Sequence, residues 1–286
     1  MAKEAIDLAN IKIKNKAPAS VNANSSQVHI SQPTFEPPAE KVLLPSKGLL
    51  YKDVTDDEDL LQGYIKIRPM TLNEEKILTT TRLVKTGQAI ELVFRNCIKS
   101  NIDPRDLLSS DRLFLMFWLR GISYGHQYTF TLRCPSATCG RQFKYTIDIS
   151  KQPIKEIDPD ISEPIELELP KTKAIIYYRL PRGRDEEQLR RLEEKAVGFN
   201  DIDNTTTERL KILIERIITP DGSELPKEQW DAFLNSLIAY DSAYIRQDMI
   251  SKDAGIEPIK NVICPYCDEQ FEEDIPITVD FFRVSR

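Results

Sequence analysis

Four cysteines arranged in two close pairs are the residues of this 286-residue chain best suited to chemistry. Cys134 and Cys139 form the first pair, Cys264 and Cys267 the second, and a proline follows the first cysteine of each. Thiolate zinc sites use pairs separated by about two to four residues, because a tight turn lets both sulfurs reach one ion at ~2.3 Å. The spacing therefore predicts a metal site made of all four cysteines.

The predicted site has structural rather than catalytic chemistry. Four thiolates complete a tetrahedral shell and leave no open position for water or substrate. The two pairs lie about 130 residues apart, so a shared ion would fasten two distant parts of the chain together. Zinc is the expected cofactor, with iron as the other metal that such a set can hold. The remaining alternatives are four unrelated reduced cysteines and a disulfide.

The other reactive residues do not form a catalytic constellation. His29 and His126 are the only histidines, and His126 is an optional metal ligand because it precedes the first cysteine pair by eight residues. Cys97 falls on the apolar face of a predicted helix, where a free cysteine is usually a small buried hydrophobe. Neither a glycine-rich phosphate loop nor a Gly-x-Ser-x-Gly motif is present. We therefore predict that the protein is not an enzyme.

Charge and hydropathy exclude further classes of protein. The formal net charge is −6, from 39 basic and 45 acidic residues, whereas a nucleic-acid-binding domain needs a basic patch or stripe. No apolar run reaches the roughly 20 residues of a membrane span. Arginines at 182, 184, 190 and 191 alternate with acidic residues, which predicts a surface helix with i,i+4 ion pairs rather than an anion site. Neither nucleic acid nor membrane is an expected partner.

Apolar periodicity in the first half of the chain predicts an α+β fold. Thr71, with Glu74 three residues later, predicts a capping box at a helix start. The expected strands are residues 64–69 and 128–132, and the expected helices are residues 71–84, 89–99 and 110–121. The second strand leads directly into the first cysteine pair.

The second half repeats this order. It predicts strands at 174–180 and 260–263 and helices beginning at 185, 207 (to 218), 227 (to 239) and 242 (to 252). The apolar positions after each cysteine pair also have identical offsets, namely Phe143, Ile147 and Ile149 against Phe271, Ile275 and Ile277. We therefore predict two similar helical lobes, each ending in a β-hairpin zinc knuckle, joined by the shared four-cysteine site.

Three segments follow from these patterns. Residues 1–40 are rich in Ala, Ser, Asn and Pro and predict an extended or disordered arm. The arm is either a floppy terminus or a segment that orders against a partner subunit. Residues 41–150 form the expected first lobe with the knuckle of Cys134 and Cys139. Residues 151–286 form the expected second lobe with the knuckle of Cys264 and Cys267.

Four runs of residues are distinctive in combination, namely LPSKGLLY at 44–51, IRPMTLNEEK at 67–76, DLLSSDR at 106–112 and LRGISYG at 119–125. Together they resemble the T-even bacteriophage baseplate hub protein family. The resemblance is clearest over residues 42–150. It implies a structural or assembly role in the tail hub of a contractile-tailed phage, with other hub proteins and the tape measure protein as partners and several copies per assembly. It implies the host cytoplasm during assembly and then the virion tail baseplate.

Two further functions stay open at this point. One is a tail assembly chaperone that leaves before the virion is complete. The other is a zinc-ribbon nucleic-acid-binding protein, against which the acidic balance argues.

The expected helix at 110–121 also predicts a surface for assembly. Residues 113–119 are apolar all the way round the helix, whereas a helix on the surface of a lobe has an apolar stripe and a polar face. Because a lobe of about 90 residues has few elements with which to surround it, we expect a neighbouring subunit to cover part of this helix.

Overall fold

The computed structural model describes residues 35–196 and 205–282. The chain divides into two units, Met1–Glu36 and Pro37–Arg286. Nearly the whole predicted arm lies outside the described residues. Strand β1 begins at Glu40, one residue before the expected start of the first lobe. The division of the second unit into lobes at residue 150 stays a prediction.

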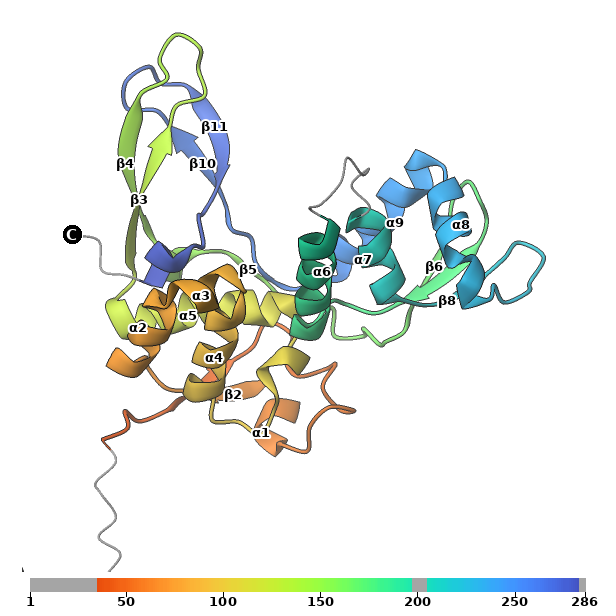
Figure 1. Ribbon diagram of the computed structural model, residues 1–286, viewed down its shortest axis with the longest axis horizontal. Coiled ribbons are helices and arrows are strands. Elements are labelled where there is room, and N and C mark those ends of the chain that lie inside the picture. The colour runs from red at the N-terminus through yellow and green to blue at the C-terminus, as the bar shows by residue number, and fades with distance from the viewer. Residues whose placement is uncertain (1–34, 197–204, 283–286) are drawn as a thin grey trace, which may run out of the picture. The chain divides into compact units, whose positions relative to one another are not determined.

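Helices and short antiparallel strands make up the second unit (Figure 1). The helices are α1 (Glu58–Leu61), α2 (Leu72–Thr79), α3 (Thr81–Lys85), α4 (Gln88–Cys97), α5 (Ser109–Tyr124), α6 (Gly183–Ala196), α7 (Thr205–Leu213), α8 (Trp230–Ser236) and α9 (Ala239–Lys252). The strands are β1 (Glu40–Leu43), β2 (Tyr64–Ile67), β3 (Gln127–Arg133), β4 (Gln142–Asp148), β5 (Ile154–Lys155), β6 (Ile165–Glu168), β7 (Ile175–Tyr178), β8 (Ile214–Ile218), β9 (Gly255–Ile256), β10 (Ile259–Ile263) and β11 (Gln270–Asp274). Short 3₁₀ segments are η1 (Pro104–Asp106), η2 (Ile149–Lys151), η3 (Lys227–Gln229) and η4 (Val279–Phe282).

The strands of the described residues form small antiparallel sheets. Strands β1 and β2 pair with each other, as do β3 with β4, β5 with β9 and β10 with β11, and β6, β7 and β8 form a three-stranded sheet. The predicted α+β class is confirmed. The capping box is also present, because the Thr71 hydroxyl accepts from the Asn73 backbone N–H and the Thr71 backbone N–H donates to the Glu74 carboxylate.

Two helix predictions are wrong in their extent. The helix expected at 207–218 ends at Leu213, and the chain continues as β8, in which Ile217 is buried opposite Ile176 of β7. Three β-branched isoleucines in five residues favour a strand, since branching at Cβ restricts χ1 in a helix. The helix expected at 71–84 is interrupted at Thr80, whose backbone is extended and whose hydroxyl donates to the Lys76 carbonyl.

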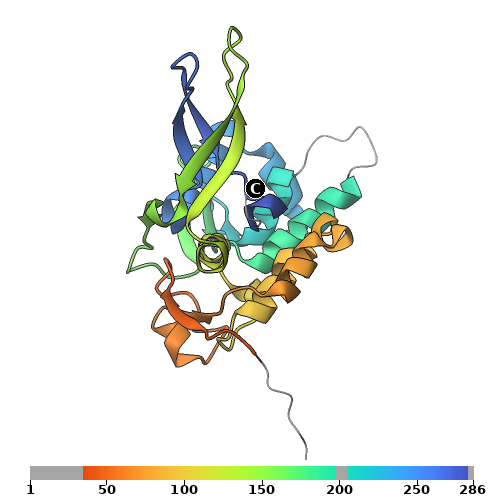
Figure 2. The same ribbon diagram turned by 90° about the vertical axis from the view of Figure 1, so that its left-hand side faces the viewer.

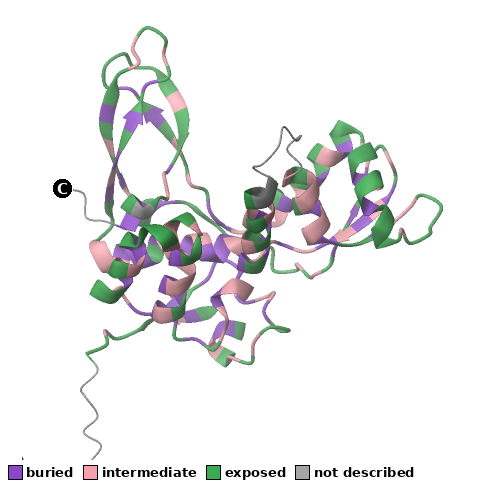
Figure 3. Ribbon diagram, in the orientation of Figure 1, coloured by how far each residue is buried: buried purple, intermediate pink, exposed green. Residues whose placement is uncertain are grey.

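Helix α5 lies in the middle of the core (Figures 1 and 3). It packs against β9, α6, η2 and η4, and Leu115 and Leu119 are completely buried. Its first turn is joined by the backbone to a distant part of the chain, because the Ser109 N–H donates to the Pro181 carbonyl at 2.8 Å. The helix therefore connects residues of both expected lobes.

A buried carboxylate ties the loop after β1 to α5. Asp111 accepts hydrogen bonds from the Ser46 hydroxyl at 2.5 Å, the Ser46 backbone N–H at 3.1 Å and the Tyr51 hydroxyl at 2.6 Å. Burial raises the pKa of Asp111 to about 6, and the hydrogen bonds oppose that rise only in part. Two of the runs that carried the family resemblance, 44–51 and 106–112, thus meet at one side chain.

Candidate metal centre

The first cysteine pair lies in the turn between β3 and β4. The backbone N–H of Cys134 donates to the Arg141 carbonyl at 2.9 Å, which closes the hairpin around the turn. The N–H groups of Cys139 and Gly140 both donate to the Ser136 carbonyl, at 3.1 and 3.0 Å. Gly140 has φ of 57°, a left-handed conformation that glycine adopts without steric cost. The turn therefore brings both sulfurs to the same side.

The second pair lies in the turn between β10 and β11 and is built the same way. The N–H of Cys264 donates to the Glu269 carbonyl at 2.9 Å, two residues beyond the second cysteine, as Arg141 lies two beyond Cys139. The residue after the second cysteine is again left-handed, here Asp268 with φ of 60°. Aspartate is one of the few other residue types that tolerates this conformation.

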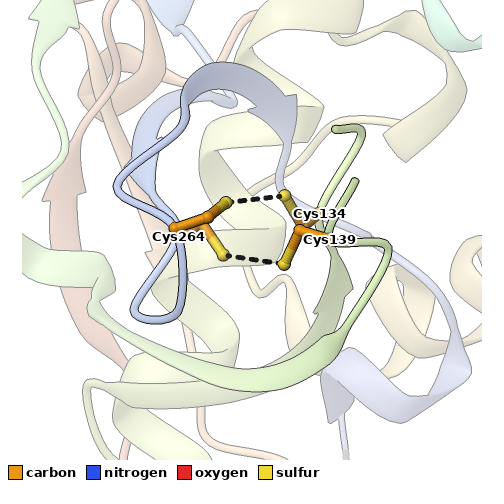
Figure 4. Close-up of side chains that lie close together, drawn as sticks. Cys134, Cys139 and Cys264 are labelled. Atoms are coloured by element: carbon orange, nitrogen blue, oxygen red, sulfur yellow. Dashed lines mark hydrogen bonds between the residues drawn. The ribbon is translucent and has the colours of Figure 1, made fainter. Parts of the chain in front are cut away.

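The two turns place four sulfurs in one cluster (Figure 4). The Cys134 and Cys267 sulfurs are 3.6 Å apart and the Cys139 and Cys264 sulfurs 3.9 Å apart. All four sulfurs lie within 4.8 Å of one another. A tetrahedron with sulfurs ~2.3 Å from a central ion has edges of about 3.8 Å, whereas a disulfide requires ~2.05 Å. The geometry fits a four-thiolate metal site, and all cysteines are free.

Packing around the cluster holds the two turns together. Tyr266 lies edge-on to Phe143 with ring centroids 6.5 Å apart, and the Arg141 guanidinium stacks over the same tyrosine at 5.1 Å. Cys134 and Cys264 are buried, which removes two of the four sulfurs from solvent. The hairpins therefore contact each other beyond the cysteines alone.

The thiols have unequal tendencies to ionise. Burial opposes ionisation of Cys264, but the backbone N–H groups of Tyr266 and Cys267 outweigh it and lower the pKa of Cys264 to about 7. The Glu269 N–H lowers the pKa of Cys267, yet burial and the three neighbouring sulfurs raise it to about 12. Burial likewise raises the pKa of Cys134. Since neighbouring thiolates repel one another, the cluster needs a cation to ionise completely.

A second contact clasps the bases of the same hairpins. The Tyr128 hydroxyl on β3 donates to the Pro276 carbonyl after β11 at 2.9 Å, and its ring meets Phe281 edge-on at 4.9 Å. The buried Arg120 guanidinium stacks over both rings and donates to the Gly125 and Gln127 carbonyls. The sequence gives no signal for Arg120, because its partners are rings and carbonyls rather than a nearby acid.

The other candidate residues lie elsewhere. His126 is an exposed loop residue and is outside the cysteine cluster, and Cys97 is buried on α4. Arg190 and Arg191 form i,i+4 ion pairs with Glu194 and Glu187 on α6, as expected for a surface helix. Arg182 donates to Glu163, and Arg184 pairs with Asp106.

Four sulfur donors at the junction of two hairpins form a closed metal site. Such a site can stabilise a fold, but it has no open position at which a substrate could react. A family model described as "T4 bacteriophage base plate protein" matches residues 41–283, and the chain belongs to this family. The match confirms the resemblance to T4-type baseplate proteins seen over residues 42–150 and extends it through the second half, while the assignment to the hub stays a prediction. No curated protein and no solved structure matches the chain.

Membership of this family indicates a structural role in the phage baseplate, which is part of the virion tail. It also indicates that the chain assembles with other baseplate proteins. It favours a non-catalytic function. None of the described helices is both long and apolar enough to span a membrane.

Proposed function

We propose that this chain is a structural component of the baseplate hub, and that a zinc ion on Cys134, Cys139, Cys264 and Cys267 locks its two hairpins together. The observation that carries the proposal is the four-sulfur cluster, which joins hairpins about 130 residues apart within a baseplate family protein. Zinc fits because the donor set is all sulfur and closed.

When bound, the ion supplies positive charge that keeps four adjacent thiolates ionised. The chain's own residues do the positioning. The N–H groups of Tyr266 and Cys267 direct hydrogen bonds at the Cys264 sulfur, and the left-handed residues Gly140 and Asp268 turn the chain back into each second strand. Outer groups of this kind orient metal ligands and support affinity.

The proposed function includes two similar lobes, residues 41–150 and 151–286, clasped at their ends. The order of elements supports this arrangement. Strand β2 is followed by helices α2 to α5 and by the β3–β4 hairpin. Strand β7 is followed by α6 to α9 and by the β10–β11 hairpin, with β8 inserted between α7 and α8 and the short β9 between α9 and β10. Other hub proteins and the tape measure protein are the proposed partners.

Quantitative mass spectrometry of purified virions tests the hub assignment. A structural component stays at a fixed, low copy number relative to the other baseplate proteins, and it disappears from tail-less particles. A chain that is abundant in the infected cell but missing from complete virions would instead be a tail assembly chaperone, and the hub assignment would then be wrong.

A further inference from the structure

The two hairpins lie side by side, and each turns one face away from the other (Figures 1 and 2). Successive side chains of a strand point to opposite faces, so burial identifies the inner face of each two-stranded ribbon. On β3 and β4 the inner residues include Phe130, Leu132 and Phe143, all buried. On β10 and β11 the inner face holds Val262 and Phe271 near the turn and the pair Lys260 and Glu273 near the base.

The outer face of the β3–β4 ribbon is polar and basic. We call the part of it nearer the cysteine turn the basic ribbon face, and it consists of Thr129, Thr131, Arg133, Gln142, Lys144 and Thr146; Gln127 and Asp148 continue the same face at the base of the ribbon. Thr131 lies directly opposite Lys144, and Arg133 opposite Gln142. These six residues carry two positive charges and no acid, and the one acid of the same two-stranded face, Asp148 at its base, is paired with Lys151. Three threonine methyl groups and the Lys144 stem give it apolar area as well.

The outer face of the β10–β11 ribbon has the opposite chemistry. We call it the acidic ribbon face, and it consists of Ile259, Asn261, Ile263, Gln270, Glu272 and Asp274. Ile259 lies opposite Asp274, and Asn261 opposite Glu272. The two isoleucines are 50% and 58% exposed, which is unusual for side chains on one strand face. The face carries two negative charges and no base.

The charges of both faces are unsatisfied within the chain. No ion pair among the described residues involves Arg133, Lys144, Glu272 or Asp274, although ion pairs are frequent elsewhere in the described part of the chain. Within the described residues, the Arg133 guanidinium donates one hydrogen bond, to the Gly140 carbonyl of its own turn. Two positive charges on one ribbon thus match two negative charges on the other, but they point in different directions.

We propose that the acidic ribbon face of one copy of this chain packs against the basic ribbon face of a second copy. The contact pairs Arg133 and Lys144 with Glu272 and Asp274, and it covers Ile259 and Ile263 with threonine methyls and the lysine stem. Complementary charge sets the register of such a contact. Because the two faces differ, the interface is heterologous, and each chain keeps one free face of each kind. Such contacts build closed rings or open filaments.

The contact is expected to be weak in isolation. Six side chains on each face are fewer than the roughly 20–30 residues per side of a standard interface. Closure of a ring strengthens weak contacts, because each chain is then held at two faces. The proposal rests on the ribbon residues and not on the hub assignment, so each can fail alone.

Sedimentation of the full-length, zinc-loaded chain between about 10 and 500 µM tests the contact. We expect concentration-dependent association at ~50 mM salt that is reduced at ~500 mM, since exposed charges are screened. Glu272→Lys and Lys144→Glu should each weaken association about tenfold. An equimolar mixture should recover it, because the first variant keeps an intact basic face and the second an intact acidic face.

Lys52→Glu and Glu228→Lys provide the matched control. Both positions are exposed and outside the ribbons, and the charge changes are the same. Thermal melting and zinc content verify that all variants fold, and Lys144→Gln and Glu272→Gln serve as milder versions. A wild-type chain that is monomeric at 500 µM, a mixture that stays monomeric, or control variants that weaken association equally would each overturn the proposal.

Discussion

The sulfurs of Cys134 and Cys267 are 3.6 Å apart, although the residues are separated by 133 positions in the chain. The second close pair, Cys139 with Cys264, also crosses between hairpins. Each sulfur therefore has a near neighbour on the other hairpin as well as its partner in the same turn. An ion at the centre would bond across the junction through all four residues, and removing any one of them would weaken the link between the hairpins.

Replacing Cys264 with serine tests this link. The variant keeps three thiolates and loses the Cys264 thiolate, whose pKa is lowered to about 7, so we expect zinc to fall from about one per chain to well below that. Because metal binding is coupled to folding, the loss should cost several kcal/mol and lower the melting temperature or make the protein insoluble. Metal analysis of denatured protein and thermal melting measure both effects.

Cys97→Ala is the matched control, since Cys97 is a buried cysteine outside the cluster. It should keep about one zinc per chain even if the cavity costs some stability. A wild-type chain that releases less than ~0.3 zinc on denaturation, or a soluble Cys264→Ser chain with unchanged melting temperature, would contradict the zinc proposal.

Gly48→Ala should be strongly destabilising. Gly48 has φ of 75°, and an added Cβ would lie 2.2 Å from the Leu60 carbonyl oxygen and 2.8 Å from the Gly63 nitrogen. Gly222 has a similar φ of 85° but open space around it. Gly222→Ala therefore reports the left-handed strain alone, roughly 1–2 kcal/mol. Urea unfolding should show a clearly larger loss for Gly48→Ala, and equal losses would mean that the turn relaxes to accept the Cβ.

Much of the local structure could be predicted from the sequence because its signals are local. Alternation around Phe130 indicates β3, and the Thr71 and Glu74 spacing gives the capping box. The cysteine spacing identifies residues that the structure brings together. That all four share one cluster follows from the closed coordination that a thiolate site requires, and not from any signal between the pairs.

The sequence-based predictions fail where contacts between distant residues determine the local structure or the burial of a side chain. Residues 214–218 have a helix-compatible pattern, yet pairing with β7 makes them a strand. Strand β6, which pairs with the other edge of β7, has no neighbouring helix or cysteine pattern that would locate it in the sequence. Asp111 reads as an ordinary helix acid, and only the fold shows that Ser46 and Tyr51 bury it. Arg120 is buried against rings, a combination that no spacing rule indicates.

Stability should depend on pH through Glu74. This completely buried carboxylate forms a two-pronged pair with Arg68, both distances being 3.1 Å. Burial alone would raise the pKa of Glu74. Hydrogen bonds from Arg68, Thr71 and Asn96 outweigh it and lower the pKa to about 2 from an ordinary 4.5. The folded chain thus favours the ionised form, and this stabilisation is present above pH ~4.5 and lost as the pH falls toward 2.

Glu74→Gln should therefore lower the unfolding free energy at pH 7 by on the order of 3 kcal/mol. It should also flatten the fall in stability between pH 5 and 2. Denaturant unfolding across this range measures both effects, with Glu228→Gln, an exposed acid, as the control. If the unfolding free energy of Glu74→Gln falls as steeply between pH 5 and 2 as that of the wild type, the acid dependence arises from other carboxylates.

The last prediction concerns the exposed side of α5. Of the seven apolar residues at 113–119, Phe114, Leu115, Phe117 and Leu119 are buried, whereas Leu113 and Met116 are half-buried and Trp118 is 37% exposed. The helix is thus not fully covered within the chain, which fits the expected subunit contact.

Trp118 is the residue that separates assembly from folding. Its indole N–H donates to Glu40 at 2.8 Å and its ring lies 6.0 Å from Phe114, so it has few internal contacts to lose. Tryptophan is enriched among the residues that dominate binding interfaces. Trp118→Lys should lower incorporation into baseplates about tenfold or more while changing the melting temperature little.

Leu115→Ala, at a completely buried position, should instead cost roughly 2–5 kcal/mol of stability. Complementation of a phage that lacks this protein, followed by counting of assembled particles and melting of each purified variant, makes the comparison. If Trp118→Lys assembles as well as the wild type, this side of α5 faces solvent in the baseplate.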